Sequence, residues 1–136
     1  MKIMRVTCKS NSGRDLTDMY LRLGYTTGSE FSVVVDKEYE VFAMSLWCGA
    51  IQVLLADEYH LPNWFPLEIF ELCNLKLPGD WFYAASLHNT GGLQSLWGYE
   101  RLITDPSHYD GLLERDPDAL RHFYEEEGRW RDSTIV

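Results

Sequence analysis

The sequence predicts an α+β fold, with a small antiparallel β-sheet or an SH3-like barrel in the first two thirds of the chain and two short helices after it. Short apolar or alternating segments recur at intervals of about ten residues, which is typical of strands in a small β domain. Turn-forming Gly, Asn, Asp and Ser residues separate them. Two pairs, Asp105–Pro106 and Asp116–Pro117, then place an N-cap residue before a proline suited to the first helical position.

The N-terminal segment is predicted to begin the sheet. The apolar residues of Met1–Ser10 form a short strand pattern, and Asn11–Gly13 tolerate a turn. The Gly- and Thr-rich stretch 24–29 predicts a connection. Phe31–Val35 follows with the β-branched composition of a strand.

Two long apolar runs predict a β-meander. Polar residues 36–38 separate Phe31–Val35 from the run Tyr39–Trp47. Two apolar runs with a short polar break between them are typical of a β-hairpin. Cys48–Ala50 then allow a tight reversal into Ile51–Ala56. We therefore expect three consecutive strands side by side, with one face of their sheet buried.

Two prolines limit the regular structure that the next segment can form. Asp57–His60 predicts a polar turn, and Pro62 and Pro66 exclude a central strand or a helix interior between them. Extended alternation resumes at Glu68–Cys73, and Trp81–Leu87 predicts a further strand.

A polar loop at His88–Gly92 leads to a segment, residues 93–103, that fits either a strand or a helix. Alternation around Trp97 and Tyr99 favours a strand, whereas the apolar residues within 93–97 also fit helical spacing.

Apolar stripes support the two helices that the Asp-Pro pairs begin. Each stripe has the i, i+3, i+4 spacing of a helix face, and Gly128 is the predicted C-cap of the second helix. The stripes consist of Tyr109, Leu112 and Leu113 in the first helix and Leu120, Phe123 and Tyr124 in the second.

One domain, residues 1–136, accommodates the whole chain. With 46% hydrophobic residues, the chain can bury an ordinary core without metals or disulfides. The cysteines are odd in number and lack CxxC spacing, so we expect buried free thiols. They are Cys8, Cys48 and Cys73.

The formal net charge of −9 at pH 7 limits the expected partners. A negative field repels nucleic acids and membrane surfaces and attracts basic proteins. Met1–Lys9 interleaves basic and apolar residues instead of forming a signal peptide, and no apolar stretch approaches the roughly 20 residues of a membrane span. We expect a cytoplasmic protein that binds neither nucleic acid nor membrane.

No residue pattern supports catalysis, so we expect neither enzymatic activity nor a cofactor. The best nucleophile–base pair is Cys73 with His88, but Cys73 lies in an apolar strand pattern. Glu68 and Glu71 fit the solvent face of a strand better than an acid–base pair.

Two acid–histidine pairs have a spacing compatible with metal ligands, namely Asp57 with His60 and Asp105 with His108. Two ligands at such a spacing are common by chance, and Asp105 has a better role as an N-cap. No metal site is predicted.

The last third of the chain is the predicted partner-binding surface. From residue 100 onward it contains ten acidic residues and five arginines. Acids mixed with aromatic residues suit a cationic partner, because charges steer the partner and aromatic side chains anchor it. A solvated helix face that ends the domain is the alternative interpretation. The predicted partner-binding residues are Asp116, Asp118, Tyr124, Glu125, Glu126, Glu127 and Trp130.

Several segments together resemble a known class of proteins: residues 11–13, 33–47, 62–72 (PNWFPLEIFEL), Trp81 and 97–113 (WGYERLITDPSHYDGLL). With these segments the chain resembles small bacterial proteins found among the immunity proteins of polymorphic or contact-dependent toxins. The resemblance covers most of the chain, and none of its motifs is diagnostic of an activity.

The resemblance implies that the protein neutralises a cognate toxin, often a nuclease, by tight binding. A nuclease tends to be basic where it grips phosphates, so an acidic inhibitor can associate with it rapidly. On this hypothesis Glu125–Glu127 supply charge, and Tyr124 and Trp130 supply buried anchors.

Two other functions stay open. A small-molecule binding module would line a pocket for an apolar or sugar-like ligand with Trp47, Trp64, Trp81 and Trp97. An enzyme would require a strongly perturbed pKa in a cleft. A deep aromatic pocket with convergent polar groups favours the binding module, and an exposed acidic patch favours toxin binding. The sequence does not define the oligomeric state.

Overall fold

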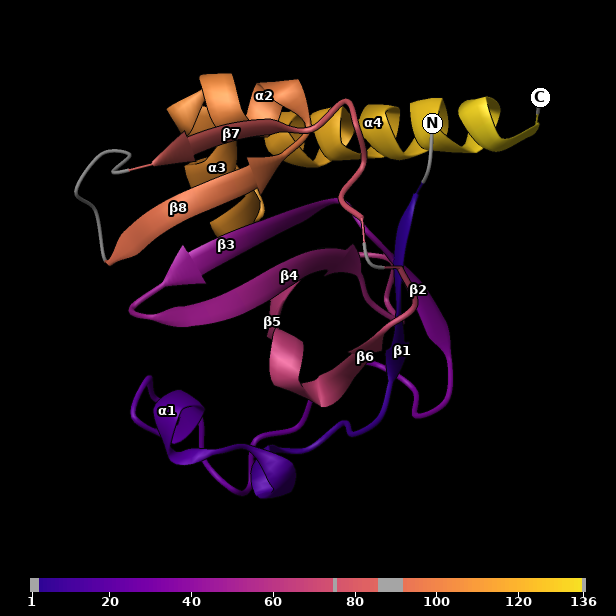
Figure 1. Ribbon diagram of the computed structural model, residues 1–136. Helices are drawn as coiled ribbons and strands as arrows, with labels where there is room; N and C mark the ends of the chain where they lie inside the picture. The colour runs from indigo at the N-terminus through magenta and orange to yellow at the C-terminus, as the bar shows by residue number, and fades with distance from the viewer. Residues whose placement is uncertain (1–2, 75, 86–91, 136) are drawn as a thin grey trace.

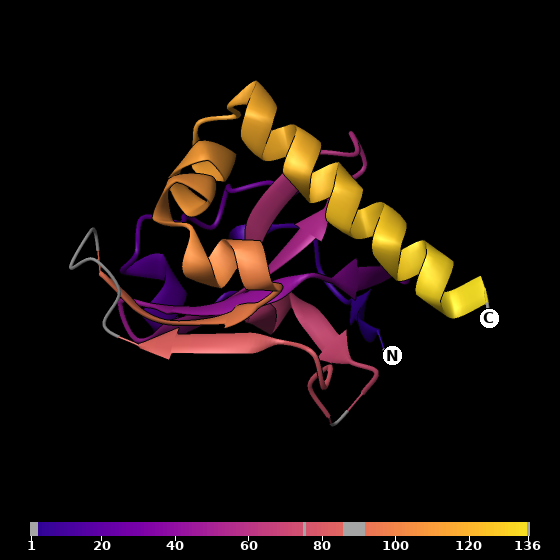
Figure 2. The ribbon, with the colours of Figure 1, turned by 90° about the horizontal axis from the view of Figure 1, so that it is seen from above.

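The protein folds as two antiparallel sheets with helices near the C-terminus, which confirms the α+β class (Figures 1 and 2). The computed structural model describes residues 3–74, 76–85 and 92–135, with residues 130–135 as backbone only. The three-stranded sheet has the order β2-β1-β6. It comprises β1 (Met4–Cys8), β2 (Glu38–Val41) and β6 (Phe70–Leu72).

The five-stranded sheet has the order β5-β4-β3-β8-β7. Three strands that are consecutive in sequence, β3 to β5, lie side by side, and β8 lies between β3 and β7. Pro62 and Pro66 are the ends of β5, which is an edge strand and therefore tolerates the missing N–H groups. The strands are β3 (Ala43–Trp47), β4 (Ala50–Ala56), β5 (Pro62–Pro66), β7 (Phe82–Ala85) and β8 (Leu93–Gly98).

The helices of the last third lie together along one side of the five-stranded sheet, away from α1 (Figures 1 and 2). The longest of them, α4, has 19 residues and is not short as predicted. The helices are α1 (Asp18–Leu21), α2 (Glu100–Thr104), α3 (Pro106–Leu113) and α4 (Pro117–Ile135), with 3-10 turns η1 (Gly13–Asp15) and η2 (Leu67–Ile69).

The five-stranded sheet separates two hydrophobic cores. Successive residues of β4 face opposite sides, so Val53 and Leu55 pack toward the three-stranded sheet while Leu54 packs toward the helices. All three side chains are fully buried. The sheet is therefore the middle layer of the molecule, and β4 contributes to both cores.

Phe42 divides the apolar run Tyr39–Trp47 between the two sheets. The run forms β2 and β3 instead of one strand. Phe42 and its neighbour Ala43 both face the helix-side core, which the alternation of a regular strand does not allow. The Phe42 ring packs edge-to-face on that of Phe123, with centroids 5.0 Å apart, and its N–H donates to the Leu54 carbonyl at 2.9 Å.

The predicted strand Phe31–Val35 is an irregular segment. Glu30 forms an isolated bridge with Ser12, and the Phe31 N–H donates to the Asn11 carbonyl at 2.9 Å. Phe31–Val35 therefore runs beside the chain that follows β1 without joining a sheet. The β-branched composition does not produce a strand here because β1 is already paired along both edges, by β2 and β6.

The segment 93–103 divides at Gly98, so the predicted strand is right for its first half and wrong for its second. Residues Leu93–Gly98 form β8, and Glu100–Thr104 form α2. Gly98 packs so closely on β3 that a Cβ there would lie 2.7 Å from the Cβ of Ala43. The loop predicted just before, His88–Gly92, lies outside the described residues except for Gly92.

Both predicted helix starts are confirmed. Asp105 is the N-cap of α3 and accepts a hydrogen bond from the Ser107 N–H at 3.1 Å. Asp116 precedes α4 and accepts one from the Ala119 N–H at 3.2 Å. Gly128 is not a C-cap, because α4 continues through it.

Phe42→Ala is predicted to destabilise the fold severely. Phe42 is 1% exposed, and truncating a buried phenylalanine costs about 3–5 kcal/mol in lost burial and residual cavity. We expect urea denaturation to show a loss of this size. Phe82→Ala is the matched control, since Phe82 is exposed and should change the free energy of unfolding by only about 0.5 kcal/mol. Equal losses would contradict the assigned role of Phe42.

Candidate functional site

Helices α3 and α4 pack closely enough to bring the acidic residues of both together. A Cβ at Gly111 would lie 2.8 Å from the Cβ of Ala119, so glycine permits the approach. The connection between the helices reverses the chain at Arg115, whose φ is 59°. A residue in this left-handed conformation commonly ends a helix.

A groove of about 500 Å³ lies between the two helices, and we call it the acidic groove. Five carboxylates line it, while no lysine or arginine of the described chain does so. Charges of one sign that line a concave surface add to a strong local potential. The carboxylates are those of Asp105, Asp110, Glu114, Asp116 and Asp118.

Three of the five carboxylates have partners. Asp105 and Asp116 accept the helix-capping hydrogen bonds described above, and Asp118 lies 3.4 Å from Arg121. Hydrogen bonds from Ser107 hold the pKa of Asp105 below its ordinary value. These acids are therefore partly neutralised by local contacts.

Asp110 and Glu114 are not neutralised. Asp110 lies in α3 and Glu114, four residues later, is the C-cap of that helix, and neither side chain has a hydrogen-bond or ion-pair partner among the described residues. Like charges at i and i+4 on a helix repel each other by about 0.2–0.5 kcal/mol. A cation in the acidic groove would remove this repulsion.

His108 also lines the acidic groove and is uncharged at neutral pH. It is 3% exposed, and burial, reinforced by the nearby charges of His122 and Arg101, lowers its pKa to about 4. Its Nε2 lies 2.6 Å from the hydroxyl oxygen of Tyr99, whose pKa is raised by burial. Its Nδ1 has no hydrogen-bond partner within the described chain.

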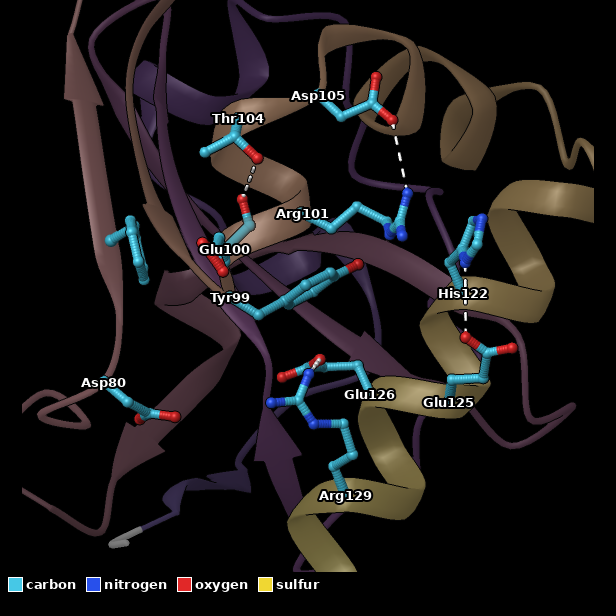
Figure 3. A pocket seen from close by; sticks show the side chains of 11 residues that line it. Asp80, Tyr99, Glu100, Arg101, Thr104, Asp105, His122, Glu125, Glu126 and Arg129 are labelled. Carbon is cyan, nitrogen blue, oxygen red and sulfur yellow. Dashed lines mark hydrogen bonds and ion pairs between the residues drawn. The ribbon is translucent and has the colours of Figure 1, made fainter.

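A second hollow of about 460 Å³, the polar cleft, is lined by residues of β7, α2 and α4 (Figure 3). Five carboxylates line it, as in the acidic groove, but two arginines line it as well. Arg101 lies 3.8 Å from Asp105, and Arg129 lies 3.2 Å from Glu126. Asp105 also lines the acidic groove, so the two hollows adjoin. Because two arginines offset part of the negative charge of the polar cleft and none of the described chain lines the acidic groove, the acidic groove is the stronger candidate for binding a positively charged group.

The predicted partner-binding residues do not form one surface. Asp116 and Asp118 line the acidic groove. Glu125 and Glu126 line the polar cleft, where Glu125 lies 3.5 Å from His122 (Figure 3). Four of the seven predicted residues therefore line one of the two adjoining hollows.

Tyr124 and Glu127 instead contact the turn between β4 and β5 and so hold α4 against it. The ring of Tyr124 stacks on that of His60 with centroids 5.4 Å apart, and its hydroxyl donates to the His60 carbonyl at 2.6 Å. Glu127 is 6% exposed, and its carboxylate lies 3.0 Å from the His60 Nε2. Glu127 is thus a buried structural contact instead of part of the exposed acidic surface.

Asp57 organises that turn. Its buried carboxylate accepts hydrogen bonds from the Ser32 hydroxyl at 2.6 Å, the Asn63 amide at 2.8 Å and the backbone N–H groups of Tyr59 and Leu61. Burial alone would raise the pKa of Asp57, but these hydrogen bonds outweigh it and lower the pKa. The network positions His60 against α4.

The backbone of Trp130 lies within α4, and its side chain lies outside the described residues, so its predicted role stays a prediction.

The sequence analysis did not identify His108, Asp110 and Glu114 as lining residues of the acidic groove. The spacing of Asp110 and Glu114 on a predicted helix was the available signal, because it puts two acids on one face without a basic neighbour.

Two cysteines are placed differently from the prediction. Cys8 is buried, and burial raises the pKa of its thiol. Cys48 and Cys73 are exposed, and the Cys73 Sγ lies 3.6 Å from the Glu38 carboxylate. Cys73 follows β6, an edge strand, and is therefore not enclosed by neighbours. His88, which the sequence analysis considered as a base for Cys73 and did not favour, lies outside the described residues.

Within the described chain, no group of three or more His, Cys, Asp and Glu side chains is arranged to hold a metal ion. The Asp57 carboxylate is engaged by the turn, while His60 contacts Glu127 on α4. His108 contacts Tyr99, and Asp105 caps α3.

No family model, curated protein or solved structure matches the chain. Among the described residues, no helix combines the length and apolar character needed to cross a membrane.

Burial of His108 predicts that acid destabilises the protein. The pKa of His108 is about 4 in the folded state and about 6.5 in an unfolded chain. The unfolded state therefore binds the proton first as the pH falls, and the free energy of unfolding decreases from pH 6.5 to pH 4 by up to about 3 kcal/mol. Urea denaturation across this range should show a smaller decrease for His108→Phe. The same decrease in both proteins would refute the assignment.

Removing the two unpaired charges of α3 is predicted to stabilise the fold. The double variant Asp110→Asn, Glu114→Gln loses the like-charge repulsion, so we expect the free energy of unfolding to rise by about 0.5 kcal/mol at low salt. Salt screens the repulsion, so the gain should disappear in 1 M NaCl, where the screening length is about 3 Å. Asp118→Asn is the control, because it loses the contact with Arg121 and should not stabilise.

Proposed function

We propose that this protein is a binding inhibitor whose acidic groove receives basic side chains of a partner protein. The observation that supports this most directly is the set of five carboxylates, two of them without partners, along one groove. A lysine or arginine side chain inserted there would form charge-assisted hydrogen bonds and relieve the repulsion within α3.

The partner in this proposal is a basic toxin domain of nuclease type, and the protein acts as its immunity protein in the cytoplasm. The formal net charge of −9 favours rapid encounter with a basic domain. A nuclease presents lysine and arginine where it contacts phosphates, so an acidic inhibitor can cover that surface. The resemblance to immunity proteins supplies the particular class.

An apolar contact next to the acidic groove would add affinity. Leu113 is 57% exposed on α3, immediately before Glu114; it does not line the acidic groove but lines the neighbouring cavity beside Tyr109. Charged contacts set the rate and orientation of association, whereas apolar anchors supply much of the affinity. Leu113 is therefore the proposed anchor beside the charged contacts, in place of the partly covered Tyr124.

The test compares two charge-matched variants. Wild-type protein is used to capture partners from the source organism, and the affinity of the captured protein is measured by calorimetry at 50 and 200 mM salt. We expect Asp110→Asn, Glu114→Gln to bind at least about tenfold more weakly, since charged contacts at an interface are worth more than about 1.4 kcal/mol. Co-expression of the wild-type protein should also relieve toxicity of the captured protein.

Glu30→Gln, Glu71→Gln is the control, because both residues are exposed and neither lines the acidic groove. It changes the net charge equally and should retain nearly full affinity. An equal loss of affinity in both variants would show that the net charge of the protein, and not the acidic groove, accounts for binding. A captured protein that is not basic, or undiminished binding by the α3 variant, would refute the proposed site.

A specific observation also favours the alternative function of small-molecule binding. Trp47 and Trp64 line a cavity on the opposite side of α3 from the acidic groove. The chemistry of this cavity is independent of partner binding through the acidic groove.

A further inference from the structure

A cavity of about 330 Å³ lies between the helix-facing side of β3, β4 and β5 and the helix α3. Four aromatic side chains line it, and we call it the aromatic pocket. Its volume is at the lower end of the range for small-molecule sites, roughly 300–1,000 Å³. The aromatic side chains are those of Tyr25, Trp47, Trp64 and Tyr109.

Only part of the predicted tryptophan set reaches this pocket. Trp64 and Tyr109 pack together with ring centroids 5.9 Å apart. Trp97 lies on the other side of the sheet, because it pairs with Met44 of β3, which packs in the opposite core. Trp81 does not line the pocket. The pocket is therefore built at the β5 side of the sheet.

Polar residues replace apolar ones where the sheet faces the pocket. Ser45 of β3 and Gln52 of β4 are cross-strand partners, and both line the pocket. They are only 2% and 6% exposed, on the same face as the fully apolar Ala43 and Leu54. A buried polar group is costly unless it is hydrogen-bonded. This pair therefore suits a ligand that supplies the missing hydrogen bonds.

Three hydrogen-bonding groups around the pocket lack partners among the described residues. The Gln52 Nε2 donates to the Tyr25 hydroxyl at 3.1 Å, which leaves its amide oxygen free. The hydroxyl of Ser45 has no partner in the same part of the chain, and neither does the indole N–H of Trp64. Two donors and one acceptor are thus available to a bound molecule.

Arg115 adds a positive charge at the exposed edge of the pocket. Its guanidinium donates to the Pro62 carbonyl at 2.6 Å and to the Asn63 side-chain oxygen at 2.8 Å, both of which are uncharged. No carboxylate of the described residues lies within ion-pair distance of it. In a protein of net charge −9, an arginine fixed by neutral groups beside an aromatic pocket is suited to an anion.

We propose that the aromatic pocket binds a small aromatic carboxylate. The ring of the ligand packs among Trp47, Trp64 and Tyr109, and its polar ring atom bonds to Ser45 or Gln52. Its carboxylate pairs with the remaining guanidinium N–H groups of Arg115. This site does not depend on the proposed inhibitor function, although both sites use residues of α3.

The test uses matched probes that differ in charge. Indole-3-acetate has the ring and the carboxylate, indole-3-acetamide has the same shape without the charge, and acetate has the charge without the ring. Calorimetry and tryptophan fluorescence should show saturable binding of indole-3-acetate, about tenfold weaker binding of the amide and none of acetate.

Variants then test separately the contribution of the Arg115 charge and that of the cavity to binding. Arg115→Gln should remove the preference for indole-3-acetate over the amide, whereas Arg121→Gln, the same charge change on α4, should leave it intact. Ser45→Leu should abolish binding of both indoles by filling the pocket. Leu113→Trp narrows the pocket at an exposed position and serves the same purpose if Ser45→Leu fails to fold.

Three results would overturn the proposal. They are the absence of saturable indole-3-acetate binding to the wild-type protein at millimolar concentration, equal affinity for the acid and the amide, and undiminished binding by the pocket-filling variants. Each is independent of whether a toxin is captured through the acidic groove.

Discussion

The arrangement of the layers depends on one buried aromatic contact, that of Phe42 with Phe123. Phe42 interrupts the apolar run that would otherwise be one strand, and it directs its ring to the helix-side core. The contact attaches α4 to the sheet, and Gly111 then lets α3 pack on α4 at Ala119. Both candidate sites follow from this packing, because the acidic groove lies between the two helices and the aromatic pocket lies under α3.

Helix α3 has two faces of different character. Asp110 and Glu114 line the acidic groove, whereas Tyr109 and Leu112 line the aromatic pocket. A helix of eight residues therefore separates an anionic hollow from an aromatic one with a cation at its edge. That cation, Arg115, lies in the connection that follows α3, where its backbone reverses the chain and its side chain holds β5. The same few residues thus determine the geometry of both hollows.

Elements whose signals are local were predictable from the sequence. Asp105 and Asp116 begin helices, because capping and the fixed φ of proline act within a few residues. Strands β3 and β4 also follow their apolar patterns and the turn between them, whereas β5 was not predicted, because its two prolines are tolerated only at the edge of a sheet. Phe31–Val35 has a strand composition without forming a strand, because composition does not reveal whether a neighbouring edge is available. Gly128 likewise lies within a helix that continues past it.

The sequence by itself determined the strong negative charge, its concentration in the last third and the helices that carry it. It did not determine which acids act together. Glu125–Glu127 are adjacent, but successive residues of a helix point about 100° apart, so they reach different surroundings. Only the tertiary structure decided that Asp110 and Glu114 share a groove with acids of α4 and that Arg115 reaches β5. These relations depend on how helices and strands distant in sequence pack, which local residue preferences do not encode.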